Sequence, residues 1–429
     1  MSIIIYWFRN DLRLEDNPAF ARACAQASHV LPIYIHQDAS EELTDWGFSR
    51  VGKHRRRFLN EALRELNQRL GTLGSALLEF NGSPVDIFKL LRDQTQSSLI
   101  YCEEIAAPEE LVLIECLREA GFTIELSWQS SMIDPHELPY ALKNMPDVFT
   151  RFRQEIERQG LSHTRPIEKV KAIPPLPPLP PLPSLPLSKP LMSDAKLQNS
   201  ESSEGSAVFH GGEFSALSHI TQYFERGLVD RYKQTRNQLM GMDYSSKFSP
   251  WLAYGCCSPR LIAERIRNYE SIQGANEGTY WLWFELLWRD YFRFLHFKYG
   301  KRLYVAKGLS DKPVNEFDEK QFLKWSSGQT GEALIDAGMR ELRETGYLSN
   351  RLRQVVASYW IYDMNGDWRT GAAWFESQLI DYDVYSNQGN WLYIAGRGTD
   401  PRGGRPFNVK KQTQDHDPDG VYRSKWLNS

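Results

Sequence analysis

The first 126 residues alternate short apolar segments with helix-forming ones, and this alternation constrains the fold more than any other feature. Five segments have the length and composition of strands: residues 2–7, 29–36, 75–80, 98–102 and 122–126. The clearest helix between them is HRRRFLNEALRELNQRL at 54–70. Strands separated by helices predict a parallel, doubly wound sheet, so we expect an α/β domain over residues 1–130. The first strand lacks the Gly-rich phosphate-binding fingerprint after it, which argues against NAD binding by this domain.

The remainder of the chain is expected to form a linker and an all-α domain. Over residues 213–429, apolar residues recur at three- and four-residue spacing without sustained strand-like alternation. Residues 131–212 are expected to be the linker, with the proline-rich run PPLPPLPPLPSLPLSKP at 174–190. Proline runs favour an extended spacer, and P-x-x-P also matches ligands of SH3-type modules. We adopt the spacer interpretation.

The composition narrows the class of protein. A chain of 429 residues with 41% apolar residues is folded and too long for one ordinary core. The net charge of −3 predicts no general affinity for nucleic acid, so DNA binding would depend on a local basic patch. None of the five cysteines forms a C-x-x-C motif, so no zinc site or disulfide framework is expected. The start SIIIYWF lacks a basic n-region and is too short for a membrane span, which predicts a soluble, cytoplasmic protein.

Polar groups are set densely among aromatic residues in the stretch from 350 to 393. An Asn–Arg–x–Arg cluster opens a Trp-rich helical region, which leads into a loop carrying Asp381, Asp383, Asn387 and Asn390. This pattern predicts a buried site for a large, flat ligand with polar edges. A calcium loop is excluded because Tyr385 and Ser386 stand at the fifth and sixth positions, so no metal site is predicted.

This stretch and three others resemble the photolyase/cryptochrome family, and in particular its cryptochrome-DASH branch. The resemblance rests on YWFRNDLRLEDNPAF at 6–20, KFSPWLAYGCCSPR at 247–260, WFELLWRDYFRF at 283–294 and the glycine- and arginine-rich segment 396–426. It implies an FAD-binding helical domain and a monomeric deoxyribodipyrimidine photolyase, a carbon–carbon lyase driven by blue light. The implied substrate is a cyclobutane pyrimidine dimer, preferably in single-stranded or looped DNA.

The resemblance also implies flavin contacts. They fall on Tyr232, Ser245, Ser246, Lys247, Phe248, Ser249, Glu285, Arg289, Asn350, Arg353, Asp381, Asp383 and Asn387. The segment 245–249 would hold the phosphates, although the residues alone equally fit a helix capped by Ser249 before Pro250. Arg353 and Asp381 would form an ion pair beside the flavin ring. Asn387 would lie opposite flavin N5, although the residues alone would make it a turn residue.

Lesion contacts follow from the same resemblance. Trp288 would be the aromatic wall for a flipped dimer, and Glu285 would read its base edge, as extrusion from the stack requires. From helical spacing alone, Glu285 would instead form an ion pair with Arg289. The expected DNA contacts are Trp288, Arg351, Tyr393, Arg397, Arg402 and Arg405, followed by Lys410 and Lys411. A second basic cluster at 53–57 is interpreted as solvated charge.

Electron supply and an antenna complete the expectations from the family. Trp391 and Trp368 match its electron-transfer tryptophans, whereas Asn315 occupies the usual distal position, so Trp325 or Trp360 would provide another exit. All of these tryptophans could alternatively serve only as core residues. Glu104 matches a residue that binds a methenyltetrahydrofolate antenna, and a solvated carboxylate is the alternative.

Two other functions fit the same flavin pocket. One is a blue-light signalling photoreceptor without repair activity, and the other is a flavoprotein that binds nucleic acid in the dark. A long C-terminal extension would favour signalling, and the chain has only three residues after Trp426.

Overall fold

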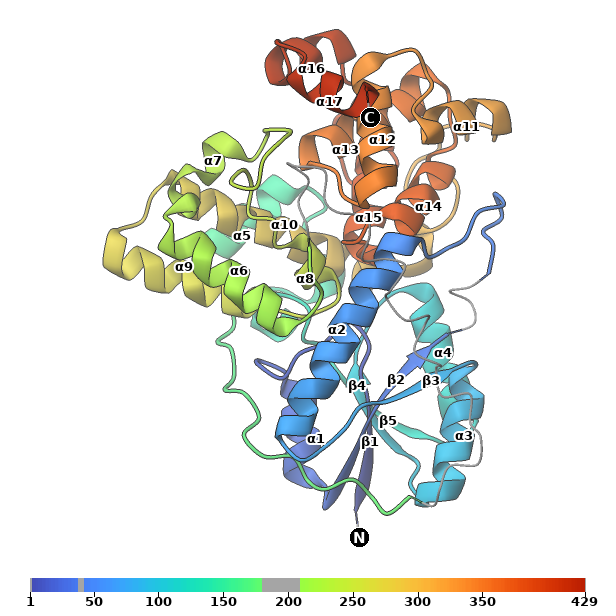
Figure 1. The fold of residues 1–429 in the computed structure, drawn as a ribbon, viewed down its shortest axis with the longest axis vertical. Helices are drawn as coiled ribbons and strands as arrows, with labels where there is room; N and C mark the ends of the chain where they lie inside the picture. Colours follow the sequence, from blue (N-terminus) through green and yellow to red (C-terminus); the bar gives the residue numbers. More distant parts are fainter. Residues whose placement is uncertain (1, 38–41, 180–208, 429) are drawn as a thin grey trace.

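The computed structural model describes residues 2–37, 42–179 and 209–428, and the second half of the proline-rich run lies outside these ranges. Five parallel strands form one sheet in the order β3-β2-β1-β4-β5. Their bounds are β1 Ile3–Trp7, β2 His29–His36, β3 Leu78–Asn81, β4 Leu99–Glu103 and β5 Thr123–Ser127. The predicted α/β fold is therefore confirmed, and the strands run together at the lower end of the molecule in Figure 1.

Strand β3 begins at Leu78, three residues later than the sequence predicts. The preceding backbone closes the end of helix α2 instead. Ser75 donates its backbone N–H to the Leu70 carbonyl at 3.0 Å, and Leu77 donates its own to the side chain of Asn67 at 2.9 Å. Because these amides are already bonded, residues 75–77 connect the helix to the strand without joining the sheet.

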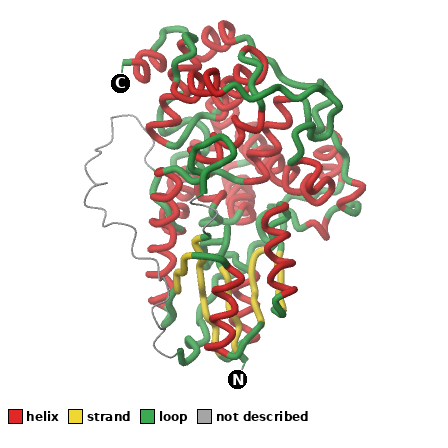
Figure 2. The backbone as a smooth tube through the Cα atoms, turned by 90° about the vertical axis from the view of Figure 1, so that its right-hand side faces the viewer, coloured by secondary structure: helices red, strands yellow, loops and turns green. Residues whose placement is uncertain are grey.

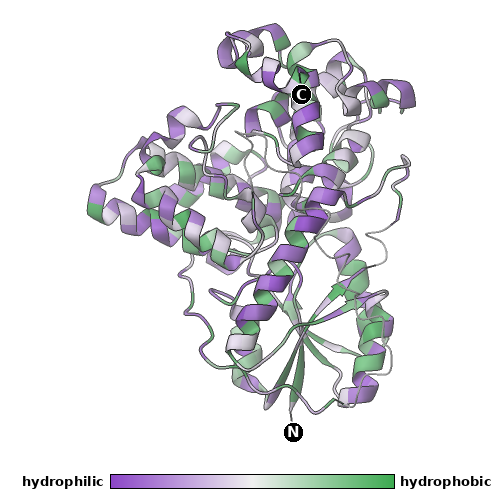
Figure 3. Cartoon of the chain, in the orientation of Figure 1, coloured by the Kyte–Doolittle hydropathy of each residue, from purple (hydrophilic) through white to green (hydrophobic). Residues whose placement is uncertain are grey.

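Helices cover both faces of the sheet. Alternate residues of β1 enter different cores, with Tyr6 packed beside the residues of α1 and α2 and Trp7 beside those of α3 and α4. The bounds are α1 Pro18–Gln26, α2 Lys53–Thr72, α3 Pro84–Thr95 and α4 Pro108–Glu119. Burial on both sides explains why the central strands β1, β2 and β4 are mainly apolar, and they appear as green arrows in Figure 3.

The upper part of the molecule is helical, as Figure 2 shows. The main helices are α5 Phe149–Arg158, α6 Glu213–Glu225, α7 Tyr232–Thr235, α8 Ser249–Ala253, α9 Pro259–Gln273, α10 Glu277–Tyr299, α11 Glu319–Ser327, α12 Ala333–Thr345, α13 Asn350–Ser358, α14 Trp368–Gln378, α15 Val384–Ala395, α16 Val409–His416 and α17 Val421–Leu427. A π-helical turn, Tyr359–Asp363, follows α13. No helix in the described ranges is long and apolar enough to cross a membrane.

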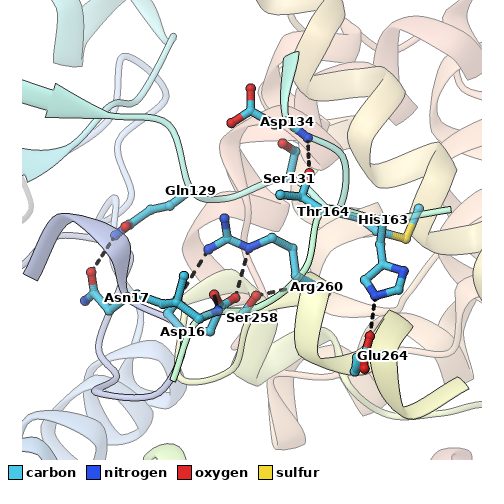
Figure 4. A network of polar contacts seen from close by, with 12 residues as sticks. Asp16, Asn17, Gln129, Ser131, Asp134, His163, Thr164, Ser258, Arg260 and Glu264 are labelled. Atoms are coloured by element: carbon cyan, nitrogen blue, oxygen red, sulfur yellow. Dashed lines mark hydrogen bonds and ion pairs between the residues drawn. The ribbon is translucent and has the colours of Figure 1, made fainter. Parts of the chain in front are cut away.

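Buried carboxylates join the two parts of the chain. Asp16, from the loop before α1, pairs with Arg260 of α9 at 2.9 Å, and it also accepts the backbone N–H of Ile167 (Figure 4). Asp290 of α10 accepts the backbone N–H groups of Met132 and Ile133, each at 2.9 Å. The segment after β5 is therefore tied to both domains, and its helix α5 packs against α10.

Candidate functional site

Two arginine–aspartate pairs lie at the start of α15. Their aspartates, Asp381 and Asp383, are two residues apart in the sequence. Arg353 of α13 bonds Asp381 at 2.8 Å, and Arg293 of α10 bonds Asp383. Asp383 also caps α15 by accepting the Ser386 N–H at 2.8 Å. Burial opposes the ionisation of Asp383, but Arg293 and Arg289 outweigh it and lower the pKa of this carboxyl to about 2. Arg293, which lies one helical turn after Arg289, is a site residue that no sequence motif indicated.

These pairs border a cavity of about 90 Å³ between α13, α14 and α15. The predicted residues Asn350, Arg353, Asp381, Asp383 and Asn387 all line it. The amide nitrogen of Asn387 donates to the Ala372 carbonyl at 3.0 Å, which fixes the orientation of that side chain. The structure thus brings together the polar residues that the sequence selects between 350 and 390, in a space that can hold only part of a dinucleotide.

The segment 245–249 forms a loop with an uncommon backbone conformation. Ser245 and Lys247 both adopt left-handed conformations, with φ of 55° and 59°. His219 supports the loop from α6 through a 2.8 Å contact with the Ser246 carbonyl. Ser249 is the first residue of α8 and not its cap, which is Phe248, so the alternative of a Ser249 cap is wrong.

Within this loop, the Lys247 side chain lines a small cavity other than that of the arginine–aspartate pairs. Its ammonium lies over the rings of Tyr244 at 3.2 Å and Tyr347 at 4.8 Å, and Glu341 lines the same small cavity. Burial lowers the pKa of Lys247 to about 7. The Lys247 side chain is therefore buried among aromatic rings, and Tyr232 lies buried at the start of α7.

An aromatic wall stands on α10. The Trp288 ring lies face to face with Phe149, with centroids 3.7 Å apart and 13° between the planes. Tyr393 of α15 meets Trp288 edge-on at 5.5 Å. Arg405 holds Tyr393 in turn, with its guanidinium 4.3 Å from the ring centre and a hydrogen bond to the hydroxyl. The predicted residues Trp288, Tyr393 and Arg405 therefore form one connected group.

Glu285 lies one turn before Trp288 but does not pair with Arg289. It bonds Arg236, which the sequence analysis did not select, and Arg236 lies 4.4 Å from the centre of the Trp281 ring. Arg289 donates to the carbonyls of Ser130 and Leu252. The ion pair expected from helical spacing is therefore wrong, because tertiary partners outcompete the neighbour on the same helix.

The predicted DNA-contacting arginines occupy different environments. Arg397 is buried and donates to the carbonyls of Lys307, Lys312 and Pro313, so it fastens one loop to another. Arg351 is half-buried and bonds Asn237 at 3.1 Å. Arg402, Lys410 and Lys411 are exposed. Exposed side chains are the ones available for phosphate contacts.

The tryptophans form a chain that leaves the cavity in one direction. Trp391 lines the cavity, and its ring centroid lies 6.3 Å from that of Trp325. Trp325 stacks on Trp360 with ring centroids 5.3 Å apart. Trp368 instead lines a separate cavity and donates to the Ala306 carbonyl at 2.9 Å. Asn315 donates to the Gly366 carbonyl at 3.2 Å, so it has a structural role at the position where the resemblance would place a tryptophan.

The separate cavity, of about 520 Å³, lies between the two domains. Its lining includes Tyr34, Trp46, Arg55, Tyr254 and Tyr382. Arg50 bridges its two sides by pairing with Glu109 of α4 at 2.6 Å and with Glu376 of α14 at 2.8 Å. Glu104 follows β4 and is not among the described residues that line this cavity, and burial raises the pKa of its carboxyl.

The chain matches known protein families and curated relatives. Residues 4–178 match the family model described as DNA photolyase, and residues 281–429 match the FAD binding domain of DNA photolyase. The chain belongs to the photolyase/cryptochrome family. Among curated relatives, the cryptochrome DASH of Gloeobacter violaceus is 42% identical over 432 residues, which cover 99% of this chain and 85% of that protein. The predicted resemblance to the DASH branch is thereby confirmed.

Solved structures agree with the fold. The cryptochrome of Synechocystis sp. PCC6803 superposes with a TM-score of 0.92 at 38% identity, covering 99% of this chain and 88% of that one. An archaeal photolyase from Sulfolobus tokodaii, described with two FAD molecules, gives a TM-score of 0.74 at 25% identity, covering 99% and 90%.

The chain therefore has an FAD-binding domain, and its own residues fit that cofactor. The Asp381 oxygen that does not bond Arg353 is buried and has no hydrogen-bond partner among the residues that the structure describes. A buried carboxylate oxygen without a donor is costly, so it calls for a ligand N–H group. The polar edge of a flavin ring offers such donors, and Arg353 and Asp383 would complete the charges around it.

Proposed function

We propose that the protein repairs cyclobutane pyrimidine dimers with blue light. When bound and reduced, FAD supplies the electron that splits the cyclobutane ring and recovers it afterwards. The observation that carries this proposal is the aromatic wall on the helix that also presents Glu285 and Arg293. In this proposal Trp288 stacks on the extruded base, and Glu285, released from Arg236, accepts hydrogen bonds from the base edge. Asn387 keeps its amide fixed beside the flavin.

We further propose that the lesion is taken from single-stranded or looped DNA. Extruding a dimer from a duplex costs a few kcal/mol of unpairing and unstacking. A chain with a net charge of −3 has little general attraction to phosphates with which to offset that cost. Tyr393, beside Trp288, and exposed Arg402 offer stacking and a local phosphate contact.

All five cysteines are free, which supports the expected reducing, intracellular setting.

A light-dependent repair assay tests this function directly. Oligonucleotides with one dimer, in single-stranded and duplex form, are illuminated with the reduced protein at matched salt. We expect repair of both forms, with tighter binding of the single strand, and a loss of about 1–3 kcal/mol of binding in Trp288→Ala. The control is Trp374→Ala, because Trp374 is a half-buried tryptophan of α14 that contacts Phe48 and Phe322 instead.

The outcomes of that assay separate the candidate functions. No repair of either form by protein that retains FAD would contradict the photolyase proposal and favour light signalling. Equal affinity for the two DNA forms would contradict only the preference for single strands.

For the antenna, we propose a second chromophore, methenyltetrahydrofolate, at the α/β domain. Two positions compete, the surroundings of Glu104 and the cavity lined by Arg55 and Tyr382. Glu104→Gln should weaken folate retention if the first is correct, whereas Tyr254→Ala should do so if the second is correct. FAD content serves as the control in both variants. Wild-type protein that never retains added folate would contradict both positions.

A further inference from the structure

Phe149 belongs to the segment that the sequence assigns to the linker, yet its ring lies directly on the proposed lesion wall. The centroid distance of 3.7 Å and interplanar angle of 13° to Trp288 describe a nearly parallel stack. The other aromatic neighbours of Trp288 stand edge-on or tilted, with Tyr291 and Tyr393 both at 5.5 Å and Phe292 at 5.4 Å. One face of the indole is therefore covered by Phe149.

The backbone before Phe149 is fastened to the same helix that carries Trp288. Lys298 of α10 donates to the Met145 carbonyl and to the Asp147 carboxylate, each at 2.6 Å. The hydroxyls of Tyr291 and Tyr299 also bond Asp147. Four hydrogen bonds from three residues of α10 thus fix where α5 begins.

The Phe149 ring itself has little freedom. It is 5% exposed and meets Phe284 at 5.2 Å and Tyr291 at 5.4 Å, both nearly perpendicular. Edge contacts on two sides set the plane of the ring, and the face-to-face contact passes that plane on to Trp288. The orientation of the indole is thereby decided by a residue outside the helical domain that the sequence defines.

We propose that Phe149 is a positioning residue for the lesion, which holds Trp288 in the orientation that an extruded base requires. This inference rests on the proposed function. An indole with one covered face offers a single face for stacking, and an indole already immobilised loses less side-chain freedom when a base arrives. A side chain that is still mobile before binding must be immobilised on binding, and this weakens affinity by about 2- to 12-fold. Loss of Phe149, which would free the indole, should have this effect.

A double-mutant cycle tests the proposal, with the affinity for a single-stranded oligonucleotide containing one dimer as the readout. Phe149→Ala should weaken binding by about 2- to 12-fold in the parent and should have no further effect in Trp288→Ala. Phe149→Tyr, which keeps a flat ring, should restore affinity. Phe149→Leu keeps apolar volume without the flat ring, and it provides the same comparison if the alanine variant does not fold.

The matched control is Ile156→Ala. Ile156 lies two turns further along α5, is fully buried and takes no part in the ring contacts around Trp288. Its loss should lower the unfolding midpoint at least as much as Phe149→Ala while leaving lesion affinity near the parent value. Equal losses of affinity in the two alanine variants would overturn the proposal, since they would report only a disturbed α5.

The remaining outcomes separate this inference from the function beneath it. Additive losses in the double mutant, or a loss in Trp288→Ala without one in Phe149→Ala, overturn the positioning role and leave the photolyase proposal standing. Unchanged lesion affinity in both Trp288→Ala and Phe149→Ala overturns lesion recognition by this wall, and the positioning role with it.

Discussion

The two sides of the site are built from different interactions. The flavin side depends on buried charge pairs, Arg353 with Asp381 and Arg293 with Asp383, in which the carboxylates come from the loop before α15. The proposed lesion side depends on ring contacts between Phe149, Trp288 and Tyr393. The first uses helices and loops of the helical domain alone, whereas the second takes a residue from the segment after the sheet.

This difference predicts different responses to damage. Removing one partner of a buried ion pair leaves an uncompensated charge and costs about 3–5 kcal/mol. Removing one ring from a stack costs about 0.5–1.5 kcal/mol beyond the lost apolar burial. The flavin side should therefore fail abruptly, and the lesion side should weaken in steps.

The largest effect is expected at Arg293. Arg293→Leu removes the main partner of Asp383, so the variant should lose about 3–5 kcal/mol of unfolding free energy and most of its FAD. Urea unfolding and the flavin absorbance of purified protein measure the two losses. Lys301→Leu, at an exposed position beyond the end of α10, is the control. Full FAD content in Arg293→Leu would remove the charge pair from the description of the flavin side.

A pH-dependent effect is expected at Glu103, a buried residue at the end of β4. Burial, together with the negative charge of Asp11, raises its pKa to about 8. Between about pH 4.5 and pH 8 the folded protein keeps a proton that the unfolded chain releases, so this residue lowers stability as pH rises through that range. As the pH rises from 5 to 8, the free energy of unfolding of Glu103→Gln should increase by about 2–4 kcal/mol relative to that of the parent.

Urea titrations at pH 5 and pH 8 measure that difference. Glu125→Gln, at an exposed position on the neighbouring strand β5, should show no such change. A constant difference between Glu103→Gln and the parent at the two pH values would show that Glu103 titrates as an ordinary carboxyl.

Photoreduction tests whether the tryptophans beside the cavity do more than fill the core. Trp391→Phe should slow light-driven reduction of bound FAD to a small fraction of the parent rate in the presence of a thiol reductant. Trp325→Phe should slow it more than Trp368→Phe, because Trp325 contacts Trp391 at 6.3 Å and continues to Trp360 at 5.3 Å. Flavin bleaching under blue light gives the rates, and the opposite order would assign the exit to Trp368.

The smallest effects are expected at the arginines that the sequence predicts as DNA contacts. Arg402→Ala should reduce the salt dependence of DNA binding by about one unit of the logarithmic slope without affecting stability. Arg397→Ala should instead lower stability by about 1–3 kcal/mol, since it leaves carbonyls of the 307–313 segment without donors. Titrations at several salt concentrations and urea unfolding of both variants test this division. Similar salt slopes for the two variants would place Arg397 at the DNA after all.

The parallel sheet, the helical second half and the principal polar residues that line the flavin cavity could be predicted from the sequence alone. Strand and helix periodicities are local, and the motifs between Asn350 and Asn387 keep their spacing on consecutive elements, so both can be read along the chain. The same is true of Trp288 and Tyr393, which stand within recognisable segments.

The partner that each of these residues takes depends on the three-dimensional packing. Arg236 replaces Arg289 as the partner of Glu285, Arg397 turns inward to carbonyls, and Phe149 reaches Trp288 from a segment that looks like a connector. Helical spacing predicts neighbours within one helix, but a buried charge or ring takes whichever partner packing brings closest. That choice depends on contacts between residues far apart in the chain, which no local pattern records.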